Sequence, residues 1–505
     1  MRNRAVPLLL LMAVAGWIGA CRRESESIVV TPATDQSCTA LMVQGQAHSV
    51  YRQAVQALAQ GQSPQQVAHL RCLIGDAAAA QTNPEQAYRQ LVGQRFDADI
   101  LYGLLSNQLS RNLAQDRQVG KQRDAGLAWP GAYLSEAAVV AYQKTGETRF
   151  LDLFVSYYDA VLTRRDDRLN RFDTEHQRVM KAWGAVNIEK DRWIAHVTHN
   201  ARITYPATEF ARLVKADPGL KRFESKANHY LAAAQETLDA FEADLVPVPG
   251  QPGIRWYRRP FDDNLEATNH LHVVGNTWLN LAELTGEARY SQHVEELIKI
   301  FLSGVHREPG GLVSWNYFPS FAKQERQNTE YRNGQEYSEP IWKASLTAPF
   351  LLRAQGRGYA VPAELTQAIG RTFSTLSFQG NQLWRNLAQR DSRFVDVHKD
   401  KSKMGFLKNA TTLVEYGSVA PALPGQIATL VAARRDLFPR GWLSSPAMLL
   451  SYAYYLRPSS MGGAAGHPQP GAGRQSLAAP IAEPSPLAPS QAVATPVQLR
   501  QSQHR

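Results

Sequence analysis

Three segments of the chain repeat one pattern of apolar positions, each copy starting at a glycine. Gly146, Gly219 and Gly286 begin the copies, and apolar side chains follow each glycine at the same five offsets. In the first copy these are Phe150, Phe154, Tyr157, Tyr158 and Val161, and in the third they are Tyr290, Val294, Leu297, Ile298 and Phe301. Within each set the spacing i, i+4, i+7, i+8, i+11 describes one face of a helix. Gly356 marks a fourth copy, in which the following helix fits the pattern less well.

A more apolar helical segment precedes each of these turns, which makes every copy a helical hairpin. The preceding segments are "GAYLSEAAVVAYQKTG", "HNARITYPATEFARLV", "NHLHVVGNTWLNLAELTG" and "EPIWKASLTAPFLLRAQG". A fifth pair, "PGQIATLVAARRDLF" and "SSPAMLLSYAYYL", ends the repetitive part, and strand-like alternation is confined to short pieces such as "GIRWYRR" and "GLVSWNY". The glycines recur at roughly 70 residues, a hairpin period that includes long loops.

This pattern predicts an all-α fold, an (α/α) toroid in which inner and outer helices alternate and close on themselves. The competing fold is an open superhelical stack of the tetratricopeptide kind. Its period of about 34 residues is much shorter, and its loops are not long and aromatic-rich. We place the toroid body at 130–456, after an N-terminal helical region at 38–129.

The N-terminus reads as an export signal. In "MRNRAVPLLLLMAVAGWIGAC" two arginines precede an apolar run too short to span a bilayer. The ending Ile18–Cys21 resembles the bacterial lipobox, which implies a signal peptide at 1–21, acylation of Cys21 and a lipid anchor. Arg22 after the cysteine favours the outer membrane, with the body facing the periplasm or the outside. A plain signal peptide that contains a cysteine is the alternative.

The remaining cysteines and the tail complete the organisation of the chain. Cys38 and Cys72 follow a linker at 22–37, and in an oxidising compartment we expect them to form one structural disulfide. Such a bridge stabilises a fold by about 3–4 kcal/mol in the chain-entropy estimate. The segment 457–505 is rich in Pro, Ala, Gly, Ser and Gln, so we expect a disordered tail.

Polar side chains gather where the predicted inner helices begin. Because each long loop leaves an outer helix and enters the next inner one, the N-termini of the inner helices surround one mouth, where their positive dipole ends collect. The candidates at helix starts are His196, His199, Asn200, Arg202 and Tyr205, then Asn269, His270 and His272, then Glu339 and Trp342. The loops add Trp256, Arg258, Arg259, Trp315 and Tyr317. Each alone is more often structural, and their convergence at one mouth favours a functional site.

The body resembles the (α/α)-toroid enzymes that act on polysaccharides: polysaccharide lyases, six-hairpin glycosidases and the C-terminal domain of uronate epimerases. The resemblance extends over Pro130–Leu456 and rests on the hairpin period, the "TG-E-x-R-Y/F" turns, "YPATEFARLV" and "NHLHVVGNTWLNLAELTGEARY". It implies an enzyme for which an acidic polysaccharide is the substrate. Toroids of the lyase kind use Asn, His, Tyr and Arg, and each type has a counterpart here.

Those residue types suit proton abstraction next to a uronate carboxylate, as in a lyase or an epimerase. We assign neutralisation of the carboxylate to Asn269 and Arg259, the base to His270 or His199, and the acid to Tyr317 or Tyr205. The residues expected to contact substrate are Trp256, Trp315 and Trp342, which would stack on sugar rings, with Arg258, His272, Asn200 and Arg202.

Two other function classes compete with this assignment. A glycoside hydrolase needs two facing carboxyl groups, for which Glu339 with Asp263 or Glu336 is the best pair. The segment around Glu339 lacks the nearby histidine that toroid enzymes often carry, which weakens a standard hydrolase or epimerase site. The third class is a noncatalytic polysaccharide-binding lipoprotein of an exopolysaccharide export or assembly system.

Charge and metal-ligand spacing add little to the choice. The net charge of +10 is compatible with an anionic substrate, although several arginines lie in the signal peptide, linker and tail. Nucleic acid is a poor partner for an exported lipoprotein without a known binding motif. His196, His199 and Glu209 match no strong metal signature, so we predict no essential metal and no cofactor.

Overall fold

The computed structural model describes most of the repetitive body and leaves the chain ends undescribed. The described residues are 84–93, 96–119, 125–186, 188, 192–248, 250–259, 261, 263–324, 338–379, 382–383, 386–388, 408–433 and 443–457. The chain divides into two units, Met1–Ser460 and Met461–Arg505. The second unit and the residues Cys21, Cys38 and Cys72 lie outside the described ranges, as does Glu336. The predicted lipid anchor, disulfide and tail therefore stay predictions.

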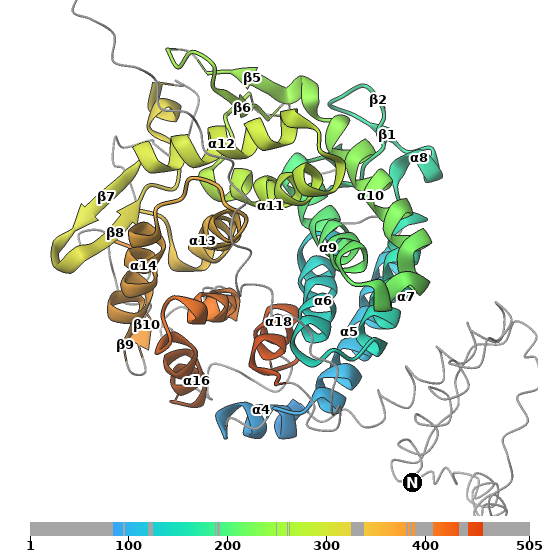
Figure 1. Ribbon diagram of the computed structural model, residues 1–505. Helices are drawn as coiled ribbons and strands as arrows, with labels where there is room; N and C mark the ends of the chain where they lie inside the picture. The colour runs from blue at the N-terminus through green and yellow to red at the C-terminus, as the bar shows by residue number, and fades with distance from the viewer. Residues whose placement is uncertain are drawn as a thin grey trace, which may run out of the picture. The chain divides into compact units, whose positions relative to one another are not determined.

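The inner helices of the first unit form a closed ring (Figure 1). In order they are α6 (Ala132–Thr145), α9 (Val197–Ala216), α11 (Thr268–Thr285), α13 (Ile341–Gly356), the short 3-10 helix η10 (Thr411–Ser418) and α18 (Pro446–Tyr455). Each packs against the next, and α18 packs back against α6. An outer helix covers each one: α7 (Arg149–Leu162), α10 (Glu224–Asp239), α12 (Ala288–Ser303), α14 (Ala363–Thr372), α16 (Leu423–Ala433) and α5 (Ala98–Val119). The predicted all-α (α/α) toroid is confirmed.

Two further groups of elements complete this unit. Helix α4 (Pro84–Val92) contacts α5 and α16, so helices before residue 130 also belong to the outer layer. Short helical elements occupy the connections: η1 (Leu127–Gly131), α8 (Asp166–Leu169), η2 (Pro218–Phe223), η3 (Glu242–Asp244), η4 (Pro309–Gly311), η5 (Ser320–Gln324) and η7 (Phe373–Ser377). None of the helices in the described ranges is both long and apolar enough to cross a membrane.

The repeated turns have one local structure in two of the hairpins. Gly146 and Gly286 end α6 and α11 with positive φ angles of 74° and 71°, a conformation that glycine adopts without strain. In both turns a threonine hydroxyl, from Thr145 or Thr285, donates to the carbonyl four residues earlier and accepts the backbone N–H two residues later. The "TG-E" sequence thus ends an inner helix and directs the chain into an outer one.

The apolar faces predicted from the spacing pack between the two helical layers. Phe154 and Tyr158 on α7 contact Tyr230 on α10, and Phe154 stacks on Phe210 of α9. All four of these side chains are buried. The aromatic positions of the repeat therefore join one hairpin to the next.

Antiparallel strand pairs shape the loops before the inner helices. They are β1 (Phe172–Asp173) with β2 (Arg178–Val179), β3 (Gly184–Ala185) with β4 (Ile194–Ala195), β5 (Leu245–Pro247) with β6 (Arg255–Tyr257), β7 (Val305–Glu308) with β8 (Leu312–Trp315), and β9 (Phe378–Gln379) with β10 (Gln382–Leu383). In the longest pair Val305 lies opposite Trp315 and Glu308 opposite Leu312. The two strand-like pieces noted in the sequence become β6 and β8, and these hairpins hold the loops that lead into α11 and α13.

Ion pairs fill the axis of the ring. Arg353 on α13 donates to Glu136 on α6 at 2.8 Å and to both oxygens of Glu415 on η10 at 2.7 and 2.8 Å. Further along the axis, Arg357 on α13 lies 3.3 Å from Glu209 on α9. The axis therefore links inner helices that are not neighbours in the ring.

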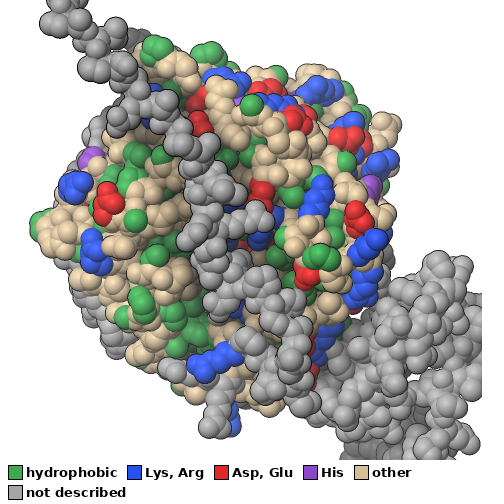
Figure 2. All heavy atoms as spheres, in the orientation of Figure 1, with side chains coloured by type: hydrophobic (Ala, Val, Ile, Leu, Met, Phe, Trp, Pro, Cys, Tyr) green, Lys and Arg blue, Asp and Glu red, His purple; other side chains and the backbone are tan. Residues whose placement is uncertain are grey.

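The charges on the end of the ring drawn in Figure 2 have no such order. Acidic and basic side chains are mixed over its described part, and no field of a single sign is visible there.

Replacing Arg353 tests the axial network. Arg353→Met leaves Glu136 and Glu415 without their shared partner, and we expect the free energy of unfolding to fall by about 3–5 kcal/mol because buried carboxylates lose their counter-charge. Urea denaturation followed by circular dichroism measures the change. Lys226→Met is the control, since it removes an exposed pair with Asp159 and should cost about 0–1 kcal/mol. Equal losses in the two variants would contradict the assigned role.

Candidate functional site

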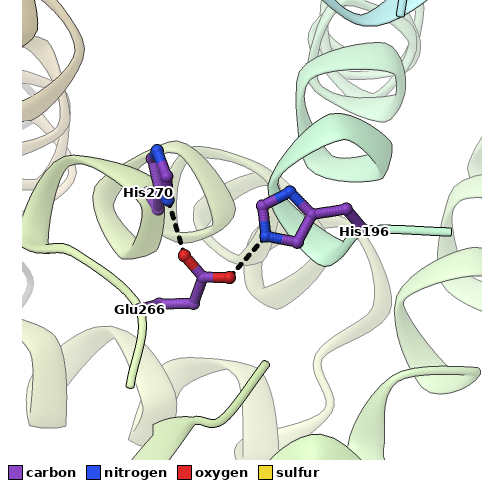
Figure 3. Close-up of side chains that lie close together, drawn as sticks. All are labelled: His196, Glu266 and His270. Atoms are coloured by element: carbon purple, nitrogen blue, oxygen red, sulfur yellow. Dashed lines mark hydrogen bonds and ion pairs between the residues drawn. The ribbon is translucent and has the colours of Figure 1, made fainter. Parts of the chain in front are cut away.

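One buried carboxylate joins two histidines at the mouth of the ring. Glu266 lies just before α11 and is fully buried. One of its oxygens is hydrogen-bonded to Nε2 of His196, and the other to Nδ1 of His270 at 2.5 Å (Figure 3). His196 immediately precedes α9 and His270 lies in the first turn of α11. The carboxylate therefore connects the starts of two neighbouring inner helices.

The strands hold Glu266 by its backbone. Its N–H donates to the carbonyl of Tyr257 at 2.9 Å, and its carbonyl accepts the indole N–H of Trp256 at 2.7 Å. Trp256 itself is fully buried. The predicted stacking of Trp256 on a sugar is therefore wrong for this arrangement, because the ring packs inside the fold and fixes Glu266.

Asn200 fixes the backbone at His196 in a similar way. Its side-chain oxygen accepts the backbone N–H of Trp183 at 2.8 Å, and its amide donates to the carbonyl of His196 at 2.9 Å. Asn200 is fully buried, so it positions the start of α9 and does not reach a substrate, contrary to the prediction.

A third histidine completes the cluster. The ring of His199 lies 5.0 Å from that of His196, and its Nε2 accepts the indole N–H of Trp129 at 3.2 Å. Because Nε2 accepts, the ring proton of neutral His199 sits on Nδ1. Phe261 also packs against His196, and Arg259 lies over Phe261.

Burial and the neighbouring charges set the protonation of this cluster. Burial opposes ionisation of Glu266, but the two histidines that contact it together hold its pKa well below the usual 4.5. Burial lowers the pKa of His270 below 6.5, although Glu266 acts in the opposite direction. Burial, and then His196 and His270, lower the pKa of His199 well below 6.5. At neutral pH the cluster thus holds a carboxylate against neutral His270.

Tyr317 and Lys343 lie at the same mouth. The ammonium of Lys343 donates to the phenol oxygen of Tyr317 at 2.6 Å, and the carbonyl of Tyr317 accepts the N–H of Thr268 at the start of α11. The charge of Lys343 also contributes to lowering the pKa of His270. The structure thus brings the predicted Tyr317 close to the predicted His270.

The predicted residues Asn269, His199 and Arg202 carry buried polar atoms that face no partner. Asn269 Oδ1, His199 Nδ1, and Nε and Nη2 of Arg202 accept or donate no hydrogen bond within the described part of the chain. The three side chains are 1%, 6% and 5% exposed. Buried polar atoms are normally satisfied, so this group indicates a place for a polar ligand or ordered water.

Other predicted substrate contacts are built into the interior. His272 is fully buried against Phe301 and Phe350, its Nδ1 lies 2.9 Å from the carbonyl of Thr347, and burial lowers its pKa to about 4. Trp315 and Trp342 are also buried. These side chains offer no exposed face to a sugar ring, which corrects the prediction.

Two more predicted residues, Tyr205 and Arg258, lie at the axis and in a loop, respectively. Tyr205 is buried with the guanidinium of Arg353 over its ring, and burial raises its pKa well above 10. It is therefore a poor proton donor. Arg258 pairs with Asp263 at 3.3 Å outside the histidine cluster.

Of the two carboxylate pairs expected of a hydrolase, Glu339 with Asp263 is not assembled, and the pair with Glu336 lies outside the described residues. Glu339 is fully buried and accepts the indole N–H of Trp315 at 2.5 Å, and burial raises its pKa to about 8. The side chain of Asp263 is 64% exposed and bound to Arg258. One carboxyl group thus lies in the interior and the other on the surface.

The residues that sequence reasoning missed have a recognisable signal. Glu266 precedes His270 by four residues, a spacing that places both side chains on one side of a helix start. His196 was noted at its helix start without a role, and Trp129 and Lys343 lie at two other inner-helix starts. Nothing in the sequence marks these last two as partners of His199 and Tyr317.

The cluster of His196, Glu266 and His270 also offers a set of donor atoms that suits a divalent metal. One ligand atom each from His196, Glu266 and His270 lies within 4.8 Å of the others, the one such group in the described ranges. In this arrangement, however, both ring nitrogens point at carboxylate oxygens, as expected of hydrogen bonds (Figure 3).

Comparisons with known proteins give distant structural similarities only. No family model and no curated protein matches the sequence. Similar solved structures include an inactive variant of an alpha-1,6-mannanase from Salegentibacter sp. HEL1_6 in complex with alpha-1,6-mannotetrose, with 10% identity, a TM-score of 0.40, and coverage of 69% of this chain and 98% of that one. Cellobiose 2-epimerase from Spirochaeta thermophila DSM 6192 has 14% identity and a TM-score of 0.36 over 60% of this chain and 74% of that one. Similarity at this level carries no functional argument.

Metal removal tests the hydrogen-bonded description of the cluster. We expect dialysis of the full chain against a chelator to leave its melting temperature unchanged, because Nε2 of His196 and Nδ1 of His270 already bind Glu266. Elemental analysis should find less than one metal ion per chain. A stoichiometric metal whose removal lowers the melting temperature, and which His270→Asn fails to retain, would contradict this description.

Proposed function

We propose that this chain is a saccharide-processing enzyme in which His270 moves a proton of an acidic sugar. The observation that supports it is the buried Glu266, which accepts hydrogen bonds from His196 and His270 at the mouth. Because Nδ1 of His270 faces the carboxylate, its Nε2 is the basic nitrogen, and it points away from Glu266 (Figure 3). The side chain is 17% exposed, unlike that of Glu266 at 1%.

A neutral histidine beside a fixed carboxylate is well suited to act as a general base. When Nε2 takes the proton alpha to a uronate carboxylate, the imidazolium that forms is stabilised by Glu266. The carboxylate also fixes the tautomer and the orientation of the ring before the substrate binds. His199 is less suited to this role because its Nε2 accepts from Trp129.

The groups around His270 support an anionic substrate and an acid partner. Lys343 and Arg259 place positive charge near the mouth, where the helix N-termini add their dipoles. The ammonium of Lys343, 2.6 Å from the phenol oxygen, would stabilise the phenolate left when Tyr317 gives its proton to a leaving oxygen. This division of roles fits elimination, and it fits epimerisation if the proton returns from the other face.

The competing classes have less support. Hydrolysis by Glu339 and Asp263 needs two facing carboxyl groups, and these two lie in different environments. A noncatalytic binding protein has no need of a base oriented by a buried carboxylate.

The cellular setting remains part of the proposal. With acylation at Cys21 and a Cys38–Cys72 bridge, the body would be tethered to the outer membrane, where an acidic exopolysaccharide or its export machinery is the natural partner.

Removing the imidazole tests the proposal. The full chain is mixed with glucuronate- and mannuronate-containing polymers, while ultraviolet absorbance, reducing ends and proton NMR are followed. We expect His270→Asn to lower the rate by roughly 10²–10⁴-fold, the range of general-base catalysis. Glu266→Gln should act in the same direction. His229→Asn, which changes an exposed histidine on α10, is the matched control.

The readouts separate the reactions. Rising absorbance indicates elimination, and a changed NMR spectrum without absorbance or new ends indicates epimerisation. New reducing ends without absorbance would favour hydrolysis. Full activity of His270→Asn would remove the proposed base.

The pH profile gives an independent test. Burial lowers the pKa of His270 below its usual 6.5, so the base is unprotonated at neutral pH and loses activity as the pH falls through that lowered pKa. We expect kcat/KM of the free enzyme to show an acid limb below pH 6.5. A limb centred above pH 7 would point to a different base.

A further inference from the structure

A small cavity lies on the axis of the ring, lined by residues from every inner helix. Its volume is about 20 Å³, which is room for one or two water-sized groups and too little for a sugar ring. Its polar walls include Arg202 on α9, Glu136 on α6, Arg353 on α13 and Glu415 on η10. A ligand can therefore place a substituent of a few atoms here, and nothing larger.

The cavity lies below the histidine cluster. Arg202 follows His199 by three residues on α9, and Val273, which lines the cavity, follows Asn269 by four on α11. Residues three or four apart share one face of a helix and lie about one turn, ~5 Å, apart along its axis. The cavity therefore lies about one helical turn inward of the histidine cluster along α9 and α11.

The two arginines of the cavity differ in how their donors are used. Arg353 uses all three guanidinium nitrogens, on Glu136, Glu415 and Asn276. Arg202 makes one long contact, 3.4 Å from Nη1 to Glu136. Its Nε and Nη2 donate to nothing within the described part of the chain, although the residue is only 5% exposed.

The orientation of Arg202 is fixed without those two nitrogens. The central carbon of its guanidinium lies over the ring of Tyr133, at 4.4 Å from the centroid. A contact of this kind holds the guanidinium in place without using its N–H groups. Nε–H and Nη2–H form one edge of the guanidinium, and two parallel N–H groups of this kind match the two oxygens of a carboxylate.

We propose that this edge of Arg202 binds the carboxylate of an acidic sugar whose ring stays at the mouth beside the histidines. The inference rests on the proposed function for its ligand and assigns the selectivity for uronate to Arg202. The cavity admits a carboxylate in size. Its four charges, two Arg and two Glu, are balanced, and Glu136 at 3.4 Å is a weak competitor because Arg353 holds it more closely.

Ligand-induced thermal stabilisation tests the site without requiring turnover. The melting temperature of the full chain is measured with sodium glucuronate, with glucose and with sodium chloride at the same ionic strength. We expect glucuronate alone to raise it. Arg202→Lys keeps the charge and removes the paired donors, so the shift should disappear, and Arg202→Met should behave in the same way. Arg222→Met, an exposed arginine paired with Asp152, is the control and should keep the shift.

Kinetics give the second readout. With an acidic polymer that the enzyme converts, Arg202→Lys should raise KM at least tenfold. The carboxyl-reduced polymer lacks the acidified proton and serves as a binding control, and its dissociation constant should change by less than a factor of two. If Arg202→Met does not fold, Arg202→Lys alone tests the carboxylate site.

The outcomes separate this inference from the proposed function. A full glucuronate shift in Arg202→Lys, or an equal shift with glucose, would overturn the carboxylate site and leave the cavity to ordered water. Turnover that depends on His270 but not on Arg202 would overturn the inference and keep the function. A glucuronate shift that needs Arg202, with no conversion of any acidic polymer, would support the site and remove the enzyme proposal.

Discussion

The closed ring depends on how its axis is filled. Inner helices that meet around one axis cannot all fill the space at the centre with apolar side chains of a single size. In this ring charged side chains occupy the centre. Arg353 reaches from α13 to Glu136 on α6 and to Glu415 on η10. Buried charges are tolerated when they are paired and hydrogen-bonded, and a pair that reaches across the ring also fixes which helices face each other. The axial ion pairs therefore join inner helices across the ring, while aromatic contacts between the layers pack one hairpin against the next.

The candidate site at the end of the ring also relies on a buried, hydrogen-bonded charge that joins different helices. Glu266 is a buried carboxylate with two partners, and those partners begin two different helices. Arg353 uses all three of its guanidinium nitrogens, whereas Arg202 on the axis and Asn269 and His199 at the mouth keep buried polar atoms without a partner in the described part of the chain. Unpartnered polar atoms therefore distinguish the part of the polar interior that is suited to a ligand from the part that holds the fold.

The sequence predicted the fold well because its signals are local. A glycine that ends a helix with positive φ and an apolar face at helical spacing are readable without tertiary knowledge, and Gly146 and Gly286 behave as expected. The placement of His199, Asn269 and His270 at the mouth followed from helix order alone. What failed was the distinction between residues that face a ligand and residues that support them. Trp256, Asn200 and His272 lie beside the site in sequence but are buried, and their burial is decided by strands and helices far away in the chain. Glu266 was missed because a lone carboxylate in a loop becomes informative only when two histidines from different hairpins approach it.

The bridge between His196 and His270 also makes the site sensitive to the curvature of the ring. The two histidines belong to adjacent hairpins, so the distance between them is set by the angle at which α9 and α11 pack. In an open superhelix that angle varies as the stack bends, and the carboxylate would be drawn toward one histidine or the other. A closed ring removes this freedom, because a change in the packing angle of one pair of inner helices must be compensated by the other pairs. Closure thus fixes the distance between the two histidines. This gives a structural reason for building such a site on a closed toroid instead of on an open stack of the same hairpins.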